Sequence, residues 1–243
     1  MPKIFAMILC RNCETLLPLT FEKIPTHYFD RIFVSDDAST DGSVLKASKL
    51  GLEVTHSKNR GYGGNVKNGL KFAFDEGADY VVEIHGDGAQ FDPAATLLAI
   101  PHIKNGDDFI IGSRFINRKE AIALGMPLAR FVANTVLSQI DHAVLRLPFT
   151  EYHTGFRIYG PAFKNINFAG YSNNYLFSFE VIASAAFLKL KCAEVAVKCD
   201  YSAAHTSVGY LDSTLYAIRH FKTLIDFLLA KYFRIFIGIF KNV

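Results

Sequence analysis

The residues best suited to chemistry lie in the segment from Tyr80 to Pro93, YVVEIHGDGAQFDP, where an apolar run of strand character ends in a His-Gly-Asp-Gly cluster. Such an ending delivers His85 and Asp87 to the carboxyl edge of a sheet, where open α/β folds bind ligands. The two side chains can face one ion from the same turn, and imidazole and carboxylate donors suit Mg²⁺ or Mn²⁺. Gly86 and Gly88 flank Asp87 and let a diphosphate approach the backbone. A tight turn without a ligand is the alternative interpretation.

A second candidate site follows another predicted strand, in the segment FVSDDASTDGS. Asp36 and Asp37 are expected at the same sheet edge as Asp87. A carboxylate there can accept the imide N–H of uracil or the N1–H and amino group of guanine. Ser39 and Asp41 are typical helix-capping residues, so we interpret Asp36 as facing a ligand and Asp41 as structural.

A third segment, NRGYGGNVKNG, places three glycines just before a predicted helix. Gly61, Gly63 and Gly64 can form a cradle of backbone amides at the positive end of the helix dipole, which is a common anion site. Lys67 adds a cation that can reach a phosphate, although a solvated lysine on the first helical turn is the ordinary alternative.

Alternating strand and helix patterns predict an α/β fold with a mostly parallel sheet covered on both faces. The expected strands span residues 4–9, 31–35, 52–56, 80–84, 109–112 and 193–198, and the clearest helices span residues 66–74, 94–100 and 128–145. We expect one domain over residues 1–211, followed by a helical tail over residues 212–243.

The composition bounds the class of protein. Half of the 243 residues are hydrophobic, which is ample for a packed core, and a net charge of +3 is too small to argue for nucleic acid. The N-terminal apolar run suits a buried strand better than a signal peptide, which predicts a cytoplasmic protein. Cys10 and Cys13 have the spacing of a zinc pair, but Cys192 and Cys199 do not match it, so four buried free thiols are expected.

The last segment has the pattern of a long basic amphipathic helix from Arg219 to Lys241. Lys231 and Arg234 interrupt its apolar run, which falls short of the ~20 residues that a membrane span needs. A helix lying in the interface on the inner face of the membrane is therefore the expectation. Packing on the domain or on a second subunit, as in a homo-oligomer, is the alternative.

These segments also carry a resemblance. SDDASTDGS, NRGYGGNVKNG, HGDG with QFDP, IGSRF and EYHTGFRIYG occur in the order and spacing of family 2 glycosyltransferases. The set is similar to the branch that contains dolichyl- and polyprenyl-phosphate sugar synthases, and it covers about residues 4 to 210. The resemblance implies the GT-A fold, a nucleotide-sugar donor, a divalent metal ion and inversion of the anomeric centre.

Carried over residue by residue, the resemblance makes Asp36 a base-recognition residue and Asp87 the metal and diphosphate residue of the DxD motif. Arg114 and Arg157 become cations for the donor diphosphate or the acceptor phosphate, a role that suits bidentate guanidinium groups. Glu151 stands where many relatives have an acid ahead of their SGFR-like segment. A surface ion pair is the alternative for Arg157.

The sequence departs from the family pattern in three places. His85 replaces the usual first Asp of the motif, which favours Mn²⁺ over Mg²⁺. Ala89 stands where relatives place a Gln, so Gln90 is either a metal ligand displaced by one insertion or no ligand. Cys13 occupies a position that is usually acidic, which leaves Glu14 as a possible substitute.

Three further residues have open interpretations. His153 is well placed to touch a phosphate or the metal, and His205 precedes the tail where some relatives close a loop over the donor. Glu180 lies on an otherwise apolar helix and can line an acceptor channel. For each of them, a satisfied structural role is the alternative.

The motifs and the resemblance they carry together predict an inverting glycosyltransferase that moves a sugar from a nucleotide-diphosphate sugar, with UDP favoured, to a polyprenyl-phosphate acceptor. A glycan or lipid-linked sugar hydroxyl is the alternative acceptor, and Glu151 would then be the base. The chain has no Trp, which excludes the QxxRW motif of processive synthases. A nucleotide-sugar-binding protein without catalysis is the alternative from another class.

Overall fold

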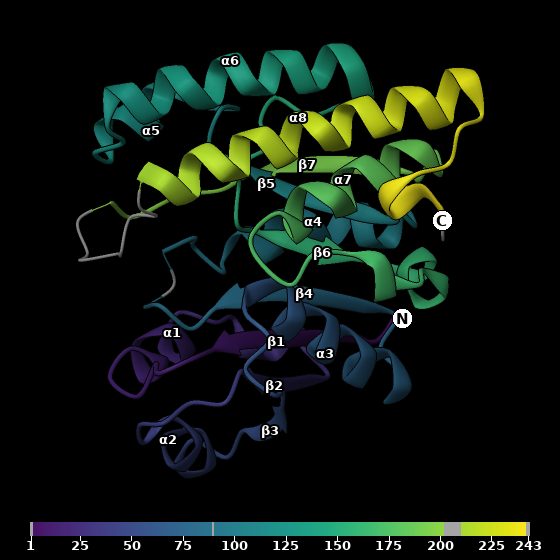
Figure 1. The fold of residues 1–243 in the computed structure, drawn as a ribbon. Coiled ribbons are helices and arrows are strands. Elements are labelled where there is room, and N and C mark those ends of the chain that lie inside the picture. The colour runs from purple at the N-terminus through teal and green to yellow at the C-terminus, as the bar shows by residue number, and fades with distance from the viewer. Residues whose placement is uncertain (1, 89, 202–209, 242–243) are drawn as a thin grey trace.

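The computed structural model describes residues 2–88, 90–201 and 210–241 as a mostly parallel sheet with helices on both faces (Figure 1). The seven strands follow the order β3-β2-β1-β4-β6-β5-β7, and β6 runs antiparallel to β4 and β5. The predicted fold class is confirmed. The strand bounds are β1 Ile4–Cys10, β2 Arg31–Asp36, β3 Glu53–His56, β4 Tyr80–His85, β5 Phe109–Ser113, β6 Arg157–Tyr159 and β7 Cys192–Ala196.

Helices connect the strands, and the longest two, α6 and α8, run side by side in the outer layer at the top of Figure 1. The α-helices are α1 Leu17–Glu22, α2 Ser43–Lys49, α3 Tyr62–Asp75, α4 Ala95–Lys104, α5 Arg118–Ala123, α6 Leu128–Leu145, α7 Phe177–Phe187 and α8 Tyr210–Phe233. Short 3₁₀ turns are η1 Thr26–Tyr28, η2 Pro161–Asn165, η3 Phe168–Gly170 and η4 Gly238–Lys241.

The central strand β1 shows why the sheet must be covered twice. All seven of its residues are buried, and successive side chains point to opposite faces. Phe5 and Met7 belong to the core under α3, α7 and α8, whereas Ala6 and Ile8 belong to the core under α1 and α4. A strand buried on both faces reads as a continuous apolar run, and the sequence of β1 has that pattern.

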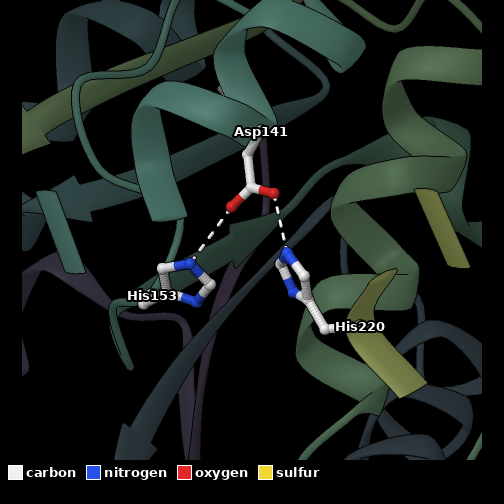
Figure 2. Close-up of side chains that lie close together, drawn as sticks. All are labelled: Asp141, His153 and His220. Carbon is white, nitrogen blue, oxygen red and sulfur yellow. Dashed lines mark hydrogen bonds and ion pairs between the residues drawn. The ribbon is translucent and has the colours of Figure 1, made fainter. Parts of the chain in front are cut away.

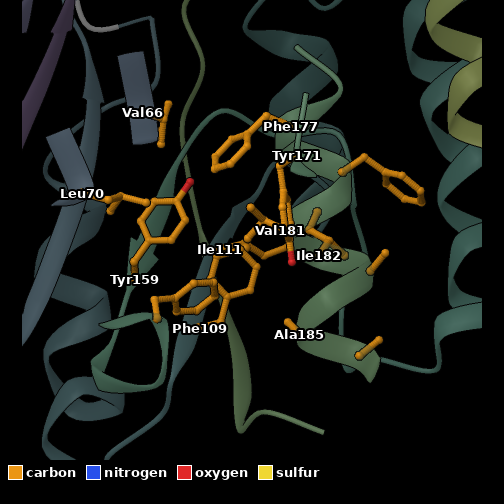
Figure 3. Close-up of a cluster of buried hydrophobic side chains, with 14 of the residues drawn as sticks. Val66, Leu70, Phe109, Ile111, Tyr159, Tyr171, Phe177, Val181, Ile182 and Ala185 are labelled. Carbon is orange, nitrogen blue, oxygen red and sulfur yellow. The ribbon is translucent and has the colours of Figure 1, made fainter. Parts of the chain in front are cut away.

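The first of these cores joins α3, the sheet and α7 (Figure 3). Val66 and Leu70 on α3 approach Tyr159 of β6, and Val181 and Ile182 on α7 approach the same side of the sheet. This packing fixes the amino end of α3 and the strand β6 relative to each other, at the sheet edge where the candidate site lies.

The C-terminal helix is present, but α8 ends at Phe233 and not at Lys241 as predicted. Arg234 adopts a left-handed φ of 57°, which stops the helix and turns the chain back, so that Ile239 and Phe240 are buried against α7. One face of α8 packs on α6 and α7, with Leu224, Phe227 and others in the main core. Among helices within the described ranges, none is long and apolar enough to cross a membrane.

The expectation of four free thiols is wrong for one pair, because Cys10 and Cys13 form a disulfide. Strand β1 ends at Cys10, and Asn12 adopts a left-handed φ of 53° in the turn that follows. This turn brings the two Cα atoms to 5.7 Å, within the range that a disulfide needs. Cys192 and Cys199 are free.

Candidate active site

His85 and Asp87 lie together at the carboxyl end of β4. His85 Nδ1 is 3.9 Å from Asp87 Oδ2, and the two side chains are 24% and 33% exposed. The other oxygen of Asp87 accepts the backbone N–H of Gln90 at 3.1 Å. The separation allows one ion to contact His85 and Asp87 from the solvent side. Ala89 lies outside the described residues.

A buried acid on β4, Glu83, organises this turn and was not among the predicted site residues. Its carboxylate accepts hydrogen bonds from the hydroxyls of Tyr62 and Tyr159, the latter at 2.7 Å. His85 Nε2 lies 3.1 Å from the same carboxylate. With Nε2–H donated to Glu83, the free electron pair of His85 is on Nδ1, on the side of Asp87. The signal in the sequence was a single charge inside an otherwise apolar strand.

Arg157, the first residue of β6, completes the network. It is 2% exposed, so the surface alternative does not hold, and its Nη1 lies 3.4 Å from the hydroxyl of Tyr62. Its Nε is buried and has no hydrogen-bond partner among the described residues. Such an unpaired buried guanidinium N–H is rare in folded proteins.

Electrostatic coupling shifts the pKa values of Glu83, His85 and Arg157. Burial raises the pKa of Glu83, but the hydrogen bond from His85 and the charge of Arg157 outweigh it, and the net pKa is lowered. For His85, burial lowers the pKa, while the hydrogen bond and charge of Glu83 and the charge of Asp87 raise it above its usual value. Burial also lowers the pKa of Arg157, but the neighbouring Tyr62 and Glu83 raise it overall.

Asp36 is the last residue of β2 and Asp37 follows it, at the predicted edge of the sheet, but both side chains are buried, each 2% exposed, and not exposed as predicted. The carboxylate of Asp36 accepts the backbone N–H of Ser39 and lies 3.5 Å from His56 Nδ1. Asp37 accepts the backbone N–H groups of Arg60 and Gly61 at 2.7 and 2.8 Å. The Gly61 amide of the predicted cradle is therefore bound to a carboxylate of the chain itself.

Close packing also explains why glycines are present in the segment before α3. A Cβ on Gly63 would lie 2.6 Å from the carbonyl oxygen of Ser172, and one on Gly61 would lie 2.9 Å from that of Asn173. The N–H of Gly64 donates to the same Asn173 carbonyl at 3.2 Å. Glycine at these positions lets the loop before α7 approach the start of α3.

Arg114, which directly follows β5, forms a buried ion pair with Glu151. Glu151 is fully buried and Arg114 is 6% exposed; Glu151 Oε2 accepts the Arg114 backbone N–H at 2.7 Å, and Oε1 accepts its Nε–H at 2.9 Å. Arg114 Nη2 also donates to Glu151 and to the carbonyl of His153, and Nη1 donates to the hydroxyl of Tyr201. Burial lowers the pKa of Arg114, but Glu151 raises it above its usual value.

The remaining predicted residues have local roles. A Cβ on Gly86 would lie 2.7 Å from the carbonyl of Leu9, and Gly88 has a φ of +85°, so both positions favour glycine. Glu14 accepts the N–H of Gly42 at 2.9 Å. Lys67 donates to the carbonyl of Tyr171 at 2.9 Å and lines a groove of about 790 Å³ along α3.

Phe91 connects the two halves of the site. Its ring centroid is 6.1 Å from that of His85, and the guanidinium carbon of Arg114 lies 5.6 Å from the same centroid. Gly155 packs closely on both Phe91 and His85. The structure thus brings the turn after β4 next to the segment from Glu151 to Arg157. His205 lies outside the described residues.

A mostly parallel sheet with helices on both faces and acids at its carboxyl edge defines an α/β protein of the GT-A type. Residues 6–162 match the family model described as glycosyl transferase family 2, and the chain belongs to that family. It is 27% identical over 218 residues to a UDP-N-acetylglucosamine–dolichyl-phosphate N-acetylglucosaminyltransferase of Methanococcus voltae, covering 82% of this chain and 86% of that protein. It is 28% identical over 233 residues to an uncharacterized protein of Methanocaldococcus jannaschii, covering 95% and 93%.

Solved structures support the fold. Glucosyl-3-phosphoglycerate synthase of Mycobacterium tuberculosis, in complex with Mn²⁺, UDP and glucosyl-3-phosphoglycerate, matches with a TM-score of 0.67 at 15% identity, covering 93% of this chain and 80% of that one. The same enzyme with Mg²⁺ and UDP matches with a TM-score of 0.67 at 15% identity, covering 93% and 79%. At this level of identity the likeness concerns the fold alone. The chain is a glycosyltransferase with the GT-A fold.

Proposed function

We propose that the chain transfers a sugar from a UDP-sugar to a polyprenyl phosphate by direct displacement with inversion. The proposal rests on the group of charged residues at the end of β4 and in the turn that follows. There Glu83 orients His85 beside Asp87, and buried Arg157 adds a positive charge. The archaeal relative named for a dolichyl-phosphate acceptor supports the choice of acceptor class.

A divalent ion fits the donor set of His85 and Asp87. Mg²⁺ and Mn²⁺ are commonly held by one or two protein ligands together with substrate phosphates. The 3.9 Å between His85 Nδ1 and Asp87 Oδ2 suits two ligands of one ion, and Glu83 is the second carboxylate that orients the imidazole. When bound, such an ion neutralises charge on the donor diphosphate.

Arg157 supplies the fixed positive charge of the chain itself. Negative charge develops on the diphosphate as it leaves, and preorganised donors aimed at that charge lower the barrier. The charge of buried Arg157 lies close to the turn of His85 and Asp87, and its neighbours Tyr62 and Glu83 hold the guanidinium in place. Asp36, next to His56 at the end of β2, is the residue proposed to accept the imide N–H of uracil.

The state of Glu151 favours a phosphate acceptor over a sugar hydroxyl. A hydroxyl needs a base to take its proton, but both carboxylate oxygens of Glu151 accept hydrogen bonds from Arg114 and the residue is fully buried. A phosphate oxygen is already an anion and needs no strong base. Glu151 is accordingly proposed to position Arg114 and the loop that leads to Arg157.

The donor is tested by thermal-shift measurements against UDP-, GDP- and dTDP-sugars with Mn²⁺. A ligand at a hundred times its Kd adds about 2.7 kcal/mol to stability. UDP-sugars should raise the melting temperature, and only weakly in Asp36→Ala. A larger shift with GDP-sugars in the unmodified chain would overturn the choice of base.

A membrane-facing surface is proposed on α6 and α8. Large apolar side chains are exposed on both helices, including Leu128 at 70% and Val132 at 51% on α6, and Ile218 at 63% and Ile225 at 57% on α8. Exposed bases accompany them on α8 and just beyond it: Arg219, Lys222, Lys231 and Arg234. Exposed apolar side chains together with exposed bases suit an anionic lipid surface, where a polyprenyl phosphate would be found.

Liposome flotation tests this surface. Because α8 contributes Leu224 and Phe227 to the core, a point substitution is a cleaner test than truncation. Ile225→Asp should weaken binding to anionic vesicles, whereas Leu45→Asp, at an equally exposed apolar position on α2, should not. Binding should also fall with salt. Absence of flotation together with a dimer that Ile225→Asp dissociates would assign the surface to a second subunit.

A further inference from the structure

Three side chains from distant parts of the chain lie close together, and one of them belongs to the loop that leads to β6 (Figure 2). Asp141 comes from α6, His153 from that loop and His220 from α8. Asp141 and His220 are fully buried. One ligand atom from each side chain lies within 4.8 Å of the other two.

The polar atoms of this cluster are incompletely satisfied by the protein. Asp141 Oδ1 is 2.8 Å from His220 Nε2 and pairs with it. Asp141 Oδ2 and His153 Nε2 are 3.1 Å apart, yet neither has a hydrogen-bond partner of acceptable geometry among the described residues. Buried polar atoms are rarely left in this state, because each costs its full desolvation. The two atoms face each other, so a single bound species can satisfy both.

We propose that Asp141, His153 and His220 bind one transition-metal ion of zinc-like chemistry. Two imidazoles and one carboxylate suit Zn²⁺ rather than Mg²⁺, which prefers oxygen ligands. Atoms bound to one ion at about 2.1 Å lie roughly 3.0–3.4 Å apart in tetrahedral or cis-octahedral geometry, and at most about 4.2 Å apart. The separations of 2.8 Å from Asp141 Oδ1 to His220 and 3.1 Å from Asp141 Oδ2 to His153 are close to this range, and a separation at the 4.8 Å bound would have to shrink by about 1.4 Å to reach it.

The surroundings have the character of a metal environment. The Phe179 ring lies 3.8 Å from that of His220 and stacks on that of His153 at 6.4 Å, which provides an apolar wall. The hydroxyl of Tyr216 is 3.5 Å from His153 Nδ1, on the side of the ring away from Asp141, where it can accept the other ring N–H. Such outer partners fix the ring orientation of a ligating histidine.

The proposed metal site lies next to residues of the candidate active site, so a bound ion would affect how they are held. His153 lies between Glu151 and Arg157, and its carbonyl accepts a hydrogen bond from Arg114. An ion shared with His220 therefore joins α8 directly to the segment that carries these residues. This site uses none of the residues proposed for the donor metal, His85 and Asp87.

Metal content tests the proposal on the full chain with any affinity tag removed. After incubation with one equivalent of ZnSO₄ and gel filtration, plasma mass spectrometry should find about one zinc per chain. His220→Gln should retain at least tenfold less. Two matched variants should keep their zinc: His102→Gln, which loses another His–Asp pair at 2.8 Å, and Asp87→Asn, which removes the donor-metal carboxylate. Retention by Asp87→Asn separates this site from the proposed function.

X-ray absorption of the zinc-loaded, unsubstituted chain provides a readout that does not depend on whether a variant folds. The proposal expects two imidazoles per zinc and no sulfur at ~2.3 Å. One zinc ion per chain is expected, so a zinc content below about 0.2 equivalents per chain would overturn the proposal. Zinc–sulfur scattering, or unchanged zinc content in a folded His220→Gln variant, would do the same.

Discussion

The Arg114–Glu151 pair yields a prediction whose size follows from the structure. Glu151→Gln keeps the shape of the side chain but removes the charge that faces a buried guanidinium. Removing one partner of a buried ion pair costs about 3–5 kcal/mol. For a chain of this size each kcal/mol shifts the melting temperature by about 2–4 °C, so a fall of roughly 6–20 °C is expected.

A surface pair offers a matched control. Glu76 pairs with Arg31 at 2.8 Å, but its side chain is 47% exposed. Glu76→Gln should change stability by no more than about 1 kcal/mol, since exposed ion pairs contribute little. Urea unfolding followed by circular dichroism measures both variants under the same conditions.

The companion measurement is nucleotide release from a UDP-sugar. If Glu151 positions Arg114, the loss of turnover in Glu151→Gln should accompany the loss of stability, and Arg114→Met should reproduce both. A Glu151→Gln chain as stable as the unsubstituted one but without turnover would show that Glu151 does not act by positioning Arg114. It would identify Glu151 as a base and favour a sugar-hydroxyl acceptor.

Three further outcomes follow from the turn after β4 and from the end of β2. Asp87→Asn should lower nucleotide release at least a hundredfold with an unchanged melting temperature, since the turn tolerates Asn; near-normal turnover would remove Asp87 from the metal site. Asp36→Ala should raise the donor KM far more than it lowers kcat, as expected for uniform binding, whereas a pure kcat defect would place Asp36 in the chemistry. Because Glu83 raises the pKa of His85, the imidazole should titrate above 6.5 by NMR, and Glu83→Gln should lower that pKa. The pair should accordingly stabilise the fold most at acidic to neutral pH, and that contribution should fade as the pH rises through the folded pKa of His85; an unchanged titration in Glu83→Gln would contradict the coupling.

Local patterns in the sequence were enough to predict the parallel strands of the sheet. Strands such as β1 and β4 are apolar runs closed by turn residues, and these endings correctly predict which side chains reach the carboxyl edge. The antiparallel strand β6 has only three residues, and its place between β4 and β5 depends on long-range pairing. That pairing has no local signal.

Interactions between distant residues account for most of what the sequence did not predict. Glu83 meets Tyr62 and Tyr159 across three elements, and Asp141 meets His220 across 79 positions. The sequence predicted that the backbone amides before α3 can bind an anion. No local pattern shows that the carboxylate of Asp37 accepts hydrogen bonds from them. The end of α8 was misplaced because a left-handed residue other than glycine stops it.

Formation of a lipid-linked sugar is the decisive test of transfer to a polyprenyl phosphate. The purified chain would be incubated with a radiolabelled UDP-sugar, Mn²⁺ and a polyprenyl phosphate in detergent, and the organic phase would be counted against samples with EDTA and with Asp87→Asn. Labelled lipid should form, and its formation should require the acceptor, the metal and Asp87. Binding of the UDP-sugar without labelled lipid, or label transferred only to a sugar hydroxyl, would contradict the proposed transfer.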